Sequence, residues 1–207
     1  MQAPKRIGLY GGTFDPIHKG HLQLAQQVHQ QLCLDELYFI PAAIPPHKPQ
    51  GTAFYHRLTM VQLAIQDLKV PWQTSDIEAH RQGPSYTIDT LRYFAEHFPE
   101  AQCWWLLVAD ALQDLHRWFH VEAFHHYARF AVFPRSGYAT CPPQDFAQRL
   151  PELWKALDFL KGEGPQFSST QVKKSLKGNP RKCPDALTEK VYQYIQEHHL
   201  YAENMLE

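Results

Sequence analysis

GGTFDPIHKGH, residues 11–21, is the stretch around which the rest of the chain is arranged. The preceding residues 5–10 (KRIGLY) form a short apolar run typical of a strand, and a helix is predicted to begin near Gly20. His18 would then precede the helix and His21 would lie in its first turn, so both rings can face one point in front of unpaired N–H groups. Amides at a helix start and two imidazole donors favour an anion, so the stretch predicts a phosphate-binding loop.

The spacing of the glycines separates this loop from the common nucleotide fingerprints. Gly8, Gly11 and Gly12 do not fit the dinucleotide motif G-x-G-x-x-G, and no G-x-x-x-x-G-K-[ST] motif occurs in the chain. A Gly-Gly turn followed by Asp-Pro is also an ordinary way to leave a strand, and single histidines are common on surfaces. The succession of strand, glycine turn, paired histidines and amphipathic helix is harder to explain by packing. We therefore expect a phosphate chemistry of another kind.

Length and composition favour a single domain over residues 1–207. A chain of this length buries roughly 70% of its unfolded surface, which is enough for a core without disulfides. The formal net charge is −1, from 20 basic and 21 acidic residues, so no nucleic-acid partner is expected. The 4 cysteines form no C-x-x-C pair and are predicted to be reduced thiols. No charged and apolar leader opens the chain and no apolar run is long enough for a bilayer, so we expect a cytoplasmic protein with no membrane partner.

The 13 histidines raise the question of a metal site. His116 and His120 have the i, i+4 spacing of a helical ligand pair. No obvious motif supplies a third ligand, and the remaining histidine pairs are more simply read as solvated faces. The sequence therefore predicts no metal held by protein ligands.

Strand-like and helical segments alternate along the chain. Strands are predicted at residues 5–10, 36–41, 72–77, 102–109 and 128–134, with a weaker edge strand at 157–160. Helical periodicity marks residues 22–32, 56–68, 112–126 and 184–198, and less strongly 146–156. This alternation predicts an α/β fold, Rossmann-like and doubly wound, whose mostly parallel sheet has helices on both faces and right-handed crossovers.

Two polar sites follow predicted strands. Residues 41–49 (PAAIPPHKP) contain four prolines, and such a stiff loop would hold His47 and Lys48 at the carboxyl edge of the sheet, where ligands gather in open α/β folds. Asp110 follows the apolar run 102–109. It can cap the next helix, meet a ribose hydroxyl, or do both.

Further helix starts and aromatic residues are candidates for ligand contacts. Residues 83–91 (GPSYTIDTL) lead from a turn onto a helix start with unpaired N–H groups. Residues 167–170 (FSST) offer hydroxyl caps for another helix, and Lys173 in its first turn opposes the helix dipole unless an anion lies there. Trp118 and Phe119 are adjacent and point in different directions, so one of them can face a ligand.

These motifs together resemble bacterial nicotinate mononucleotide adenylyltransferases over the whole length of the chain. They are GGTFDPIHKGH, PPHK at 45–48, PSYTIDTL at 84–91, ADALQDLHRW at 109–118 and FSST at 167–170. The resemblance implies that the 5′-phosphate of nicotinate mononucleotide attacks the α-phosphorus of ATP, releasing pyrophosphate and forming deamido-NAD in NAD biosynthesis. It further implies ATP and nicotinate mononucleotide as partners, with Mg²⁺ accompanying the ATP. In a transfer of this kind, the protein mainly positions the two substrates and neutralises the charge on the phosphate oxygens.

The same resemblance implies roles for individual residues. The catalytic group comprises Thr13, His18, His21 and Lys48. The ATP-binding group comprises Gly11, Gly12, Phe14, Asp110, Ser168, Ser169, Thr170 and Lys173, and the C-terminal helical part, about residues 165–207, would complete this site. The mononucleotide-binding group comprises His47, Ser85, Tyr86, Thr87, Trp118 and Arg135. Backbone N–H groups near Tyr86 and Thr87 would receive the pyridine carboxylate, and Trp118 would stack on the ring.

Two residues depart from the pattern of that family and keep alternatives open. Val108 stands where glycine is usual and Lys173 where arginine is usual, which adds bulk in one place and removes a two-pronged phosphate ligand in the other. The alternatives are nicotinamide mononucleotide or phosphopantetheine as the acceptor, or a nucleotide-binding regulator that has lost catalysis. PSYT and Trp118 argue against phosphopantetheine. The residues assigned to the reacting phosphate are intact, so an active enzyme is favoured.

Overall fold

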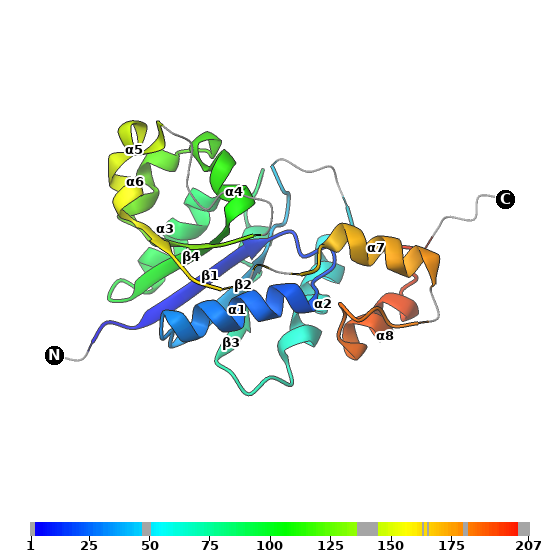
Figure 1. Ribbon diagram of the computed structural model, residues 1–207. Helices are drawn as coiled ribbons and strands as arrows, with labels where there is room; N and C mark the ends of the chain where they lie inside the picture. The colour runs from blue at the N-terminus through cyan, green and yellow to red at the C-terminus, as the bar shows by residue number, and fades with distance from the viewer. Residues whose placement is uncertain are drawn as a thin grey trace.

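A six-stranded sheet with all neighbouring strands parallel forms the centre of the molecule (Figure 1). The computed structural model describes residues 3–46, 51–135, 145–162, 164, 166–179 and 182–202. The strands are β1 (Arg6–Gly12), β2 (Glu36–Pro41), β3 (Trp72–Thr74), β4 (Gln102–Val108), β5 (Arg129–Phe133) and β6 (Leu157–Phe159). Their order is β3-β2-β1-β4-β5-β6, with the direction of winding reversing between β1 and β4. This confirms the predicted doubly wound α/β fold, in which the reversal point is the usual ligand position.

Helices cover both faces of the sheet. The α-helices are α1 (Lys19–Gln31), α2 (Phe54–Ile65), α3 (Thr87–His97), α4 (Ala109–Asp114), α5 (Phe146–Arg149), α6 (Pro151–Lys155), α7 (Ser169–Gly178) and α8 (Glu189–Glu197). Short 3₁₀ helices lie at η1 (Ile77–His80), η2 (Leu115–Arg117) and η3 (Val121–His126). Among the residues described, no helix is long and apolar enough to cross a membrane.

Side chains alternate along the strands into two hydrophobic clusters, one on each face. On β1, Ile7 and Leu9 join one cluster and Tyr10 joins the other, as the period of two requires. The Tyr10 cluster includes residues from α1, α2, α7 and α8, and the other includes residues from α3, α4, η3 and α6. Because α7 and α8 pack into the same cluster as α1, the C-terminal part shares the core of the sheet. The single domain over residues 1–207 stays a prediction.

The segment predicted as one helix over residues 112–126 is broken. Helix α4 ends at Asp114, η2 follows it, and His120 has a left-handed backbone with φ of 52° before η3 begins. A continuous α-helix cannot pass through a left-handed residue, which explains the break. His116 and His120 therefore do not lie on one helix face. Strand β3 is also shorter than predicted, because the chain turns into η1 after Thr74.

Candidate active site

Two cavities meet at residues 11–13, at the carboxyl end of β1. The phosphate-loop cavity, of about 380 Å³, is also lined by Phe14, His21 and Asp110. The tryptophan cleft, of about 190 Å³, is also lined by Tyr86 and Trp118. Gly11, Gly12 and Thr13 line both. A Cβ at Gly11 would overlap the Trp105 ring, so the close approach of strand and ring here requires glycine.

The residues predicted from sequence divide between these cavities much as their assigned roles do. Of the ATP group, Phe14, Asp110, Ser169, Thr170 and Lys173 line the phosphate-loop cavity. Of the mononucleotide group, Ser85, Tyr86, Thr87 and Trp118 line the tryptophan cleft. Arg135 differs, because it lines the phosphate-loop cavity although it was assigned to the mononucleotide. His47 and Lys48 lie outside the described residues.

The two histidines of the opening motif lie against one another. The rings of His18 and His21 are stacked with their centroids 3.7 Å apart, and the His18 backbone N–H donates to Nδ1 of His21 at 3.1 Å. A neutral His21 ring that accepts on Nδ1 carries its proton on Nε2, which is then the donor. His21 is half-buried and lines the phosphate-loop cavity. The two rings lie together as expected, but only His21 lines a cavity, since His18 is buried and lines neither of the two. That both rings act on one phosphate stays a prediction.

Burial keeps His18 neutral. The ring is 5% exposed, and burial together with repulsion from Arg135 lowers its pKa to about 4. The unfolded chain binds a proton on this residue below its ordinary pKa of 6.5, so stability must fall as the pH drops from 6.5 toward 4.

This pKa predicts a measurable pH dependence of stability. Between pH 7 and pH 5 the wild-type protein is expected to lose about 2 kcal/mol more unfolding free energy than His18→Gln, whose side chain does not titrate. Urea unfolding of both proteins at the two pH values measures the difference. Equal losses in the two proteins would contradict the neutral state of His18.

The start of α1 is less open than predicted. The Lys19 N–H donates to the carbonyl of Ala186 at 2.7 Å, and the His18 N–H is taken by His21. The chain itself therefore satisfies part of the helix end that was expected to face an anion. The prediction of a bare helix end is wrong in this respect, and the donors that face the cavity belong to the loop and to side chains.

Asp110 has two partners at the mouth of the phosphate-loop cavity. Its Oδ1 accepts from the N–H of Ala111 at 2.9 Å, within the first turn of α4, and its Oδ2 pairs with the guanidinium of Arg135. Helix α4 begins before Asp110, with Val108 as its N-cap and no side-chain cap, so the prediction that Asp110 caps the helix is wrong. Val108 precedes α4 and its half-buried side chain also lines the cavity, so the bulk that valine adds does reach the candidate ligand site.

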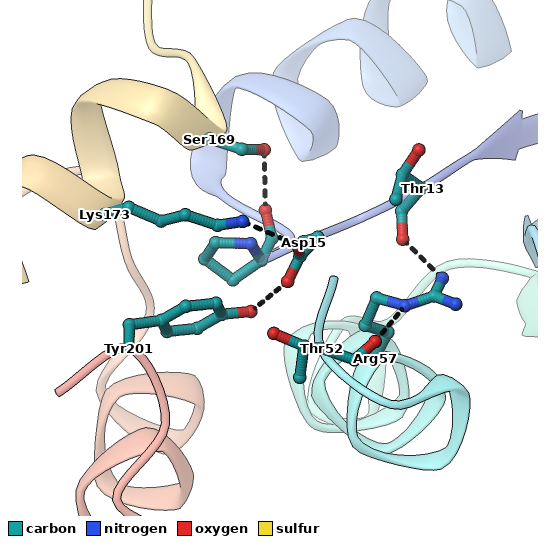
Figure 2. Close-up of polar contacts among 8 residues, drawn as sticks. Thr13, Asp15, Thr52, Arg57, Ser169, Lys173 and Tyr201 are labelled. Atoms are coloured by element: carbon teal, nitrogen blue, oxygen red, sulfur yellow. Dashed lines mark hydrogen bonds and ion pairs between the residues drawn. The ribbon is translucent and has the colours of Figure 1, made fainter. Parts of the chain in front are cut away.

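Arg57 was not identified from sequence and holds the loop in place. It is 3% exposed and donates from Nη1 to the carbonyl of Thr13 and from Nε to that of Thr52, both at 2.8 Å (Figure 2). A third, longer bond at 3.4 Å reaches the carbonyl of Ala43. The signal was present, because a charged residue at position 57 interrupts the apolar face of α2. A buried guanidinium needs such partners, and here they tie three loop segments together.

Glu78 is a second residue that sequence analysis missed. It lines the tryptophan cleft, is 4% exposed, and accepts from the Thr90 hydroxyl at 2.7 Å. Burial raises its pKa, against hydrogen bonds from Thr90 and Ser85. No periodic pattern marks this position, since it lies in η1, where the strand was expected to have ended.

Comparisons with known proteins agree with this geometry. A model of the Cytidylyltransferase-like family matches residues 9–175. The nicotinate-nucleotide adenylyltransferase of Bacillus subtilis is 34% identical over 202 residues, covering 95% of this chain and 98% of that protein. A Gloeobacter violaceus protein named probable nicotinate-nucleotide adenylyltransferase is 37% identical over 199 residues, covering 95% and 96%.

A solved structure shares the fold. Plasmodium falciparum nicotinic acid mononucleotide adenylyltransferase, complexed with NaAD, superposes with a TM-score of 0.76 at 21% identity, covering 95% of this chain and 97% of that one. Since the sequence relatives are matched along nearly their whole length, the chain belongs to the nicotinate-nucleotide adenylyltransferase family, among the cytidylyltransferase-like proteins.

Proposed function

We propose that this protein transfers the adenylyl group of ATP to nicotinate mononucleotide, giving deamido-NAD and pyrophosphate. The observation that carries the proposal is the meeting of two cavities at residues 11–13. ATP would occupy the phosphate-loop cavity and the mononucleotide the tryptophan cleft, so the two reacting phosphates come together where the cavities join. Holding two reactants in line is the main contribution that a protein makes to such a transfer.

The reaction needs no covalent intermediate on the protein. An oxygen of the mononucleotide 5′-phosphate forms the new bond to the α-phosphorus of ATP, and the bond from that phosphorus to the bridging oxygen of the β-phosphate breaks. Pyrophosphate leaves with the electron pair. His21 and the backbone of residues 12–14 would stabilise the charge on the transferring group, with Thr13 beside them and His18 holding His21 in place. The resemblance assigns Lys48 to stabilising the same charge.

The remaining ATP contacts would come from α7. Ser168 caps this helix through the Gln171 N–H at 3.3 Å, while Ser169, Thr170 and Lys173 line the phosphate-loop cavity. Hydroxyls and an ammonium at a helix start favour an anion. Asp110 and Arg135, paired with each other, would lie beside the adenosine part.

The tryptophan cleft would bind the second nucleotide. It lies at the start of α3, where the Tyr86 N–H is already used by the carbonyl of Pro84 at 2.9 Å. The Asp89 N–H also donates to the Tyr86 carbonyl, at 3.2 Å, so the first two amides of α3, those of Thr87 and Ile88, would meet the pyridine carboxylate. Ser85 lines the same cleft, and Trp118 would stack on the pyridine ring.

Mg²⁺ would enter with ATP as part of the substrate. The carboxylates that line the phosphate-loop cavity, Asp15 and Asp110, are each paired with a cation of the chain. In the described part of the chain, no group of three His, Cys, Asp or Glu side chains is arranged to hold a metal ion. Mg²⁺ commonly takes most of its ligands from substrate phosphates and water, and this donor set is consistent with that mode.

The choice between acid and amide is tested by initial rates. With saturating ATP and varied mononucleotide, kcat/KM is expected to be higher for nicotinate mononucleotide than for nicotinamide mononucleotide, because donors at the start of α3 meet a carboxylate more strongly than an amide. Pyrophosphate release and the dinucleotide product are measured together. A preference for the amide would overturn the substrate assignment. Binding of ATP without pyrophosphate release would favour a regulator that has lost catalysis.

A further inference from the structure

The C-terminal part of the chain contacts the phosphate loop at Asp15 and Pro16. The Ser169 hydroxyl donates to the carbonyl of Pro16 at 3.0 Å, and the Tyr201 hydroxyl donates to Oδ1 of Asp15 at 2.6 Å (Figure 2). Figure 2 shows α7 and the segment carrying Tyr201 on one side of Asp15, with Arg57 and Thr52 on the other. The phosphate loop therefore has partners from the C-terminal part on one side and from the segment that contains Thr52 and Arg57 on the other.

Asp15 is the centre of these contacts. Its Oδ2 pairs with Nζ of Lys173 at 2.6 Å, while Oδ1 accepts from Tyr201, so each oxygen has its own donor. Burial would raise the pKa of Asp15, but hydrogen bonds from Lys173, Thr52 and Tyr201 outweigh it and hold that pKa below its usual value. The carboxylate is therefore charged and fixed from two sides.

Tyr201 contacts Lys173 in a second way. The Lys173 Nζ lies 5.1 Å from the centroid of the Tyr201 ring, a cation–π distance. Burial and the hydrogen bond to Asp15 raise the pKa of the Tyr201 phenol, so it stays protonated and donates. The backbone of Tyr201 is left-handed, with φ of 61°, which is unfavourable for a residue with a Cβ. The Lys173 ammonium therefore has two contacts, the Tyr201 ring and the Asp15 carboxylate, and Tyr201 supplies the first and holds the second through its hydroxyl.

We infer that Tyr201 is a positioning residue for ATP, whose hydroxyl fixes Asp15 so that Asp15 holds the Lys173 ammonium at the wall of the phosphate-loop cavity. The inference rests on the proposed binding of ATP in that cavity. Lysine has a flexible stem and a point charge, so it needs such external support more than a planar guanidinium does. When Asp15 holds the Lys173 side chain in place, binding of the triphosphate does not have to order it and so avoids that entropy cost. The ammonium retains two further N–H donors for phosphate oxygens.

Tyr201→Phe removes the hydroxyl and keeps the ring. Its KM and Kd for ATP are expected to rise roughly 5-fold to 10-fold, the scale of one ordinary hydrogen bond, because the lost hydroxyl acts on ATP only through Asp15 and Lys173. The KM for nicotinate mononucleotide is expected to change by less than about twofold, because the tryptophan cleft is separate. Steady-state kinetics give the KM for each substrate. Calorimetric titration of the protein with ATP alone, which does not react without the mononucleotide, gives the Kd.

Tyr194→Phe is the matched control. The Tyr194 hydroxyl is 2.9 Å from Nδ1 of His56 and ties α8 to α2 without lining the phosphate-loop cavity. Its loss should lower Tm to an extent similar to Tyr201→Phe and leave ATP affinity unchanged. If Tyr201→Phe also leaves ATP affinity unchanged, or if it raises both KM values equally, Tyr201 only anchors the C-terminal part and the inference fails.

A double mutant tests the route through Lys173. In a Lys173→Met background, Tyr201→Phe is expected to change kcat/KM for ATP by less than about twofold, because the ammonium it positions is gone. The ratio remains measurable in the linear range even when ATP binds weakly. An undiminished effect of Tyr201→Phe in this background would exclude the route. Absence of turnover in the wild-type protein would instead contradict the proposed function, which separates the two failures.

Discussion

His21→Ala is expected to lower kcat by on the order of 100-fold or more, which is the scale of removing one hydrogen-bond donor to a transition state. His21 lines the phosphate-loop cavity, and its Nδ1 is occupied by the His18 N–H. A neutral ring in this state carries its proton on Nε2. Because charge develops on the transferring group only as the bonds change, the loss should fall mainly on kcat and less on the KM for ATP.

The measurement is a full kinetic comparison with thermal unfolding of each variant. His29→Ala is a suitable control, because His29 lies in the last turn of the same helix and contacts Trp72, with ring centroids 6.3 Å apart. His29→Ala should cost stability without a change of kcat, and His21→Ala should show the reverse. A wild-type kcat for His21→Ala, or a fall in kcat matched by His29→Ala, would remove His21 from the catalytic group.

Local patterns sufficed for most of the fold. Residues 36–41 were predicted as a strand and form β2 with the same bounds, because branched and aromatic residues there are bounded by a turn and by Pro41. The almost wholly apolar stretch 102–109 forms β4, which ends one residue earlier at Val108, at the centre of the sheet, where strands are buried on both faces. Such signals depend on neighbours in sequence, so the chain displays them directly.

Contacts between distant parts of the chain could not be predicted in the same way. Asp15, Lys173 and Tyr201 meet although 186 positions separate the first from the last, and nothing local to Lys173 distinguishes a paired lysine from one that awaits a phosphate. Lys173 was assigned to ATP from its place in the first turn of a helix and from the family resemblance. The left-handed turn at His120 is a similar case, because the apolar spacing of residues 112–126 continues through it.

The two departures from the family pattern look different in the structure. The Lys173 ammonium is held by Asp15 and by the Tyr201 ring, where a planar guanidinium would have its geometry built in. Val108 lies at the start of α4 with an extended backbone, φ −93° and ψ 148°, so valine is compatible with this conformation. The active enzyme favoured from sequence remains the better interpretation.

Trp118→Ala is expected to raise the KM for nicotinate mononucleotide roughly 10-fold to 100-fold. This is the scale of losing the one aromatic side chain on which the pyridine ring stacks. Trp118 is half-buried, packs against the core cluster, where it meets the Phe124 ring edge-on with centroids 6.3 Å apart, and also lines the tryptophan cleft. The part of the indole that lines the cleft can therefore meet a ligand. The KM for ATP should change by less than about twofold, because Trp118 does not line the phosphate-loop cavity.

Phe119→Ala separates stacking on the ligand from packing of the cleft wall. Phe119 is 48% exposed, lines the same cleft, and packs on Tyr86 with ring centroids 4.4 Å apart. If Trp118 carries the pyridine ring, Phe119→Ala should raise the mononucleotide KM much less than Trp118→Ala, although both widen the cleft. Equal rises in the KM for both substrates on Trp118→Ala, together with a lower Tm, would instead identify Trp118 as a core residue, and the stacking partner would have to be Phe119 or Tyr86.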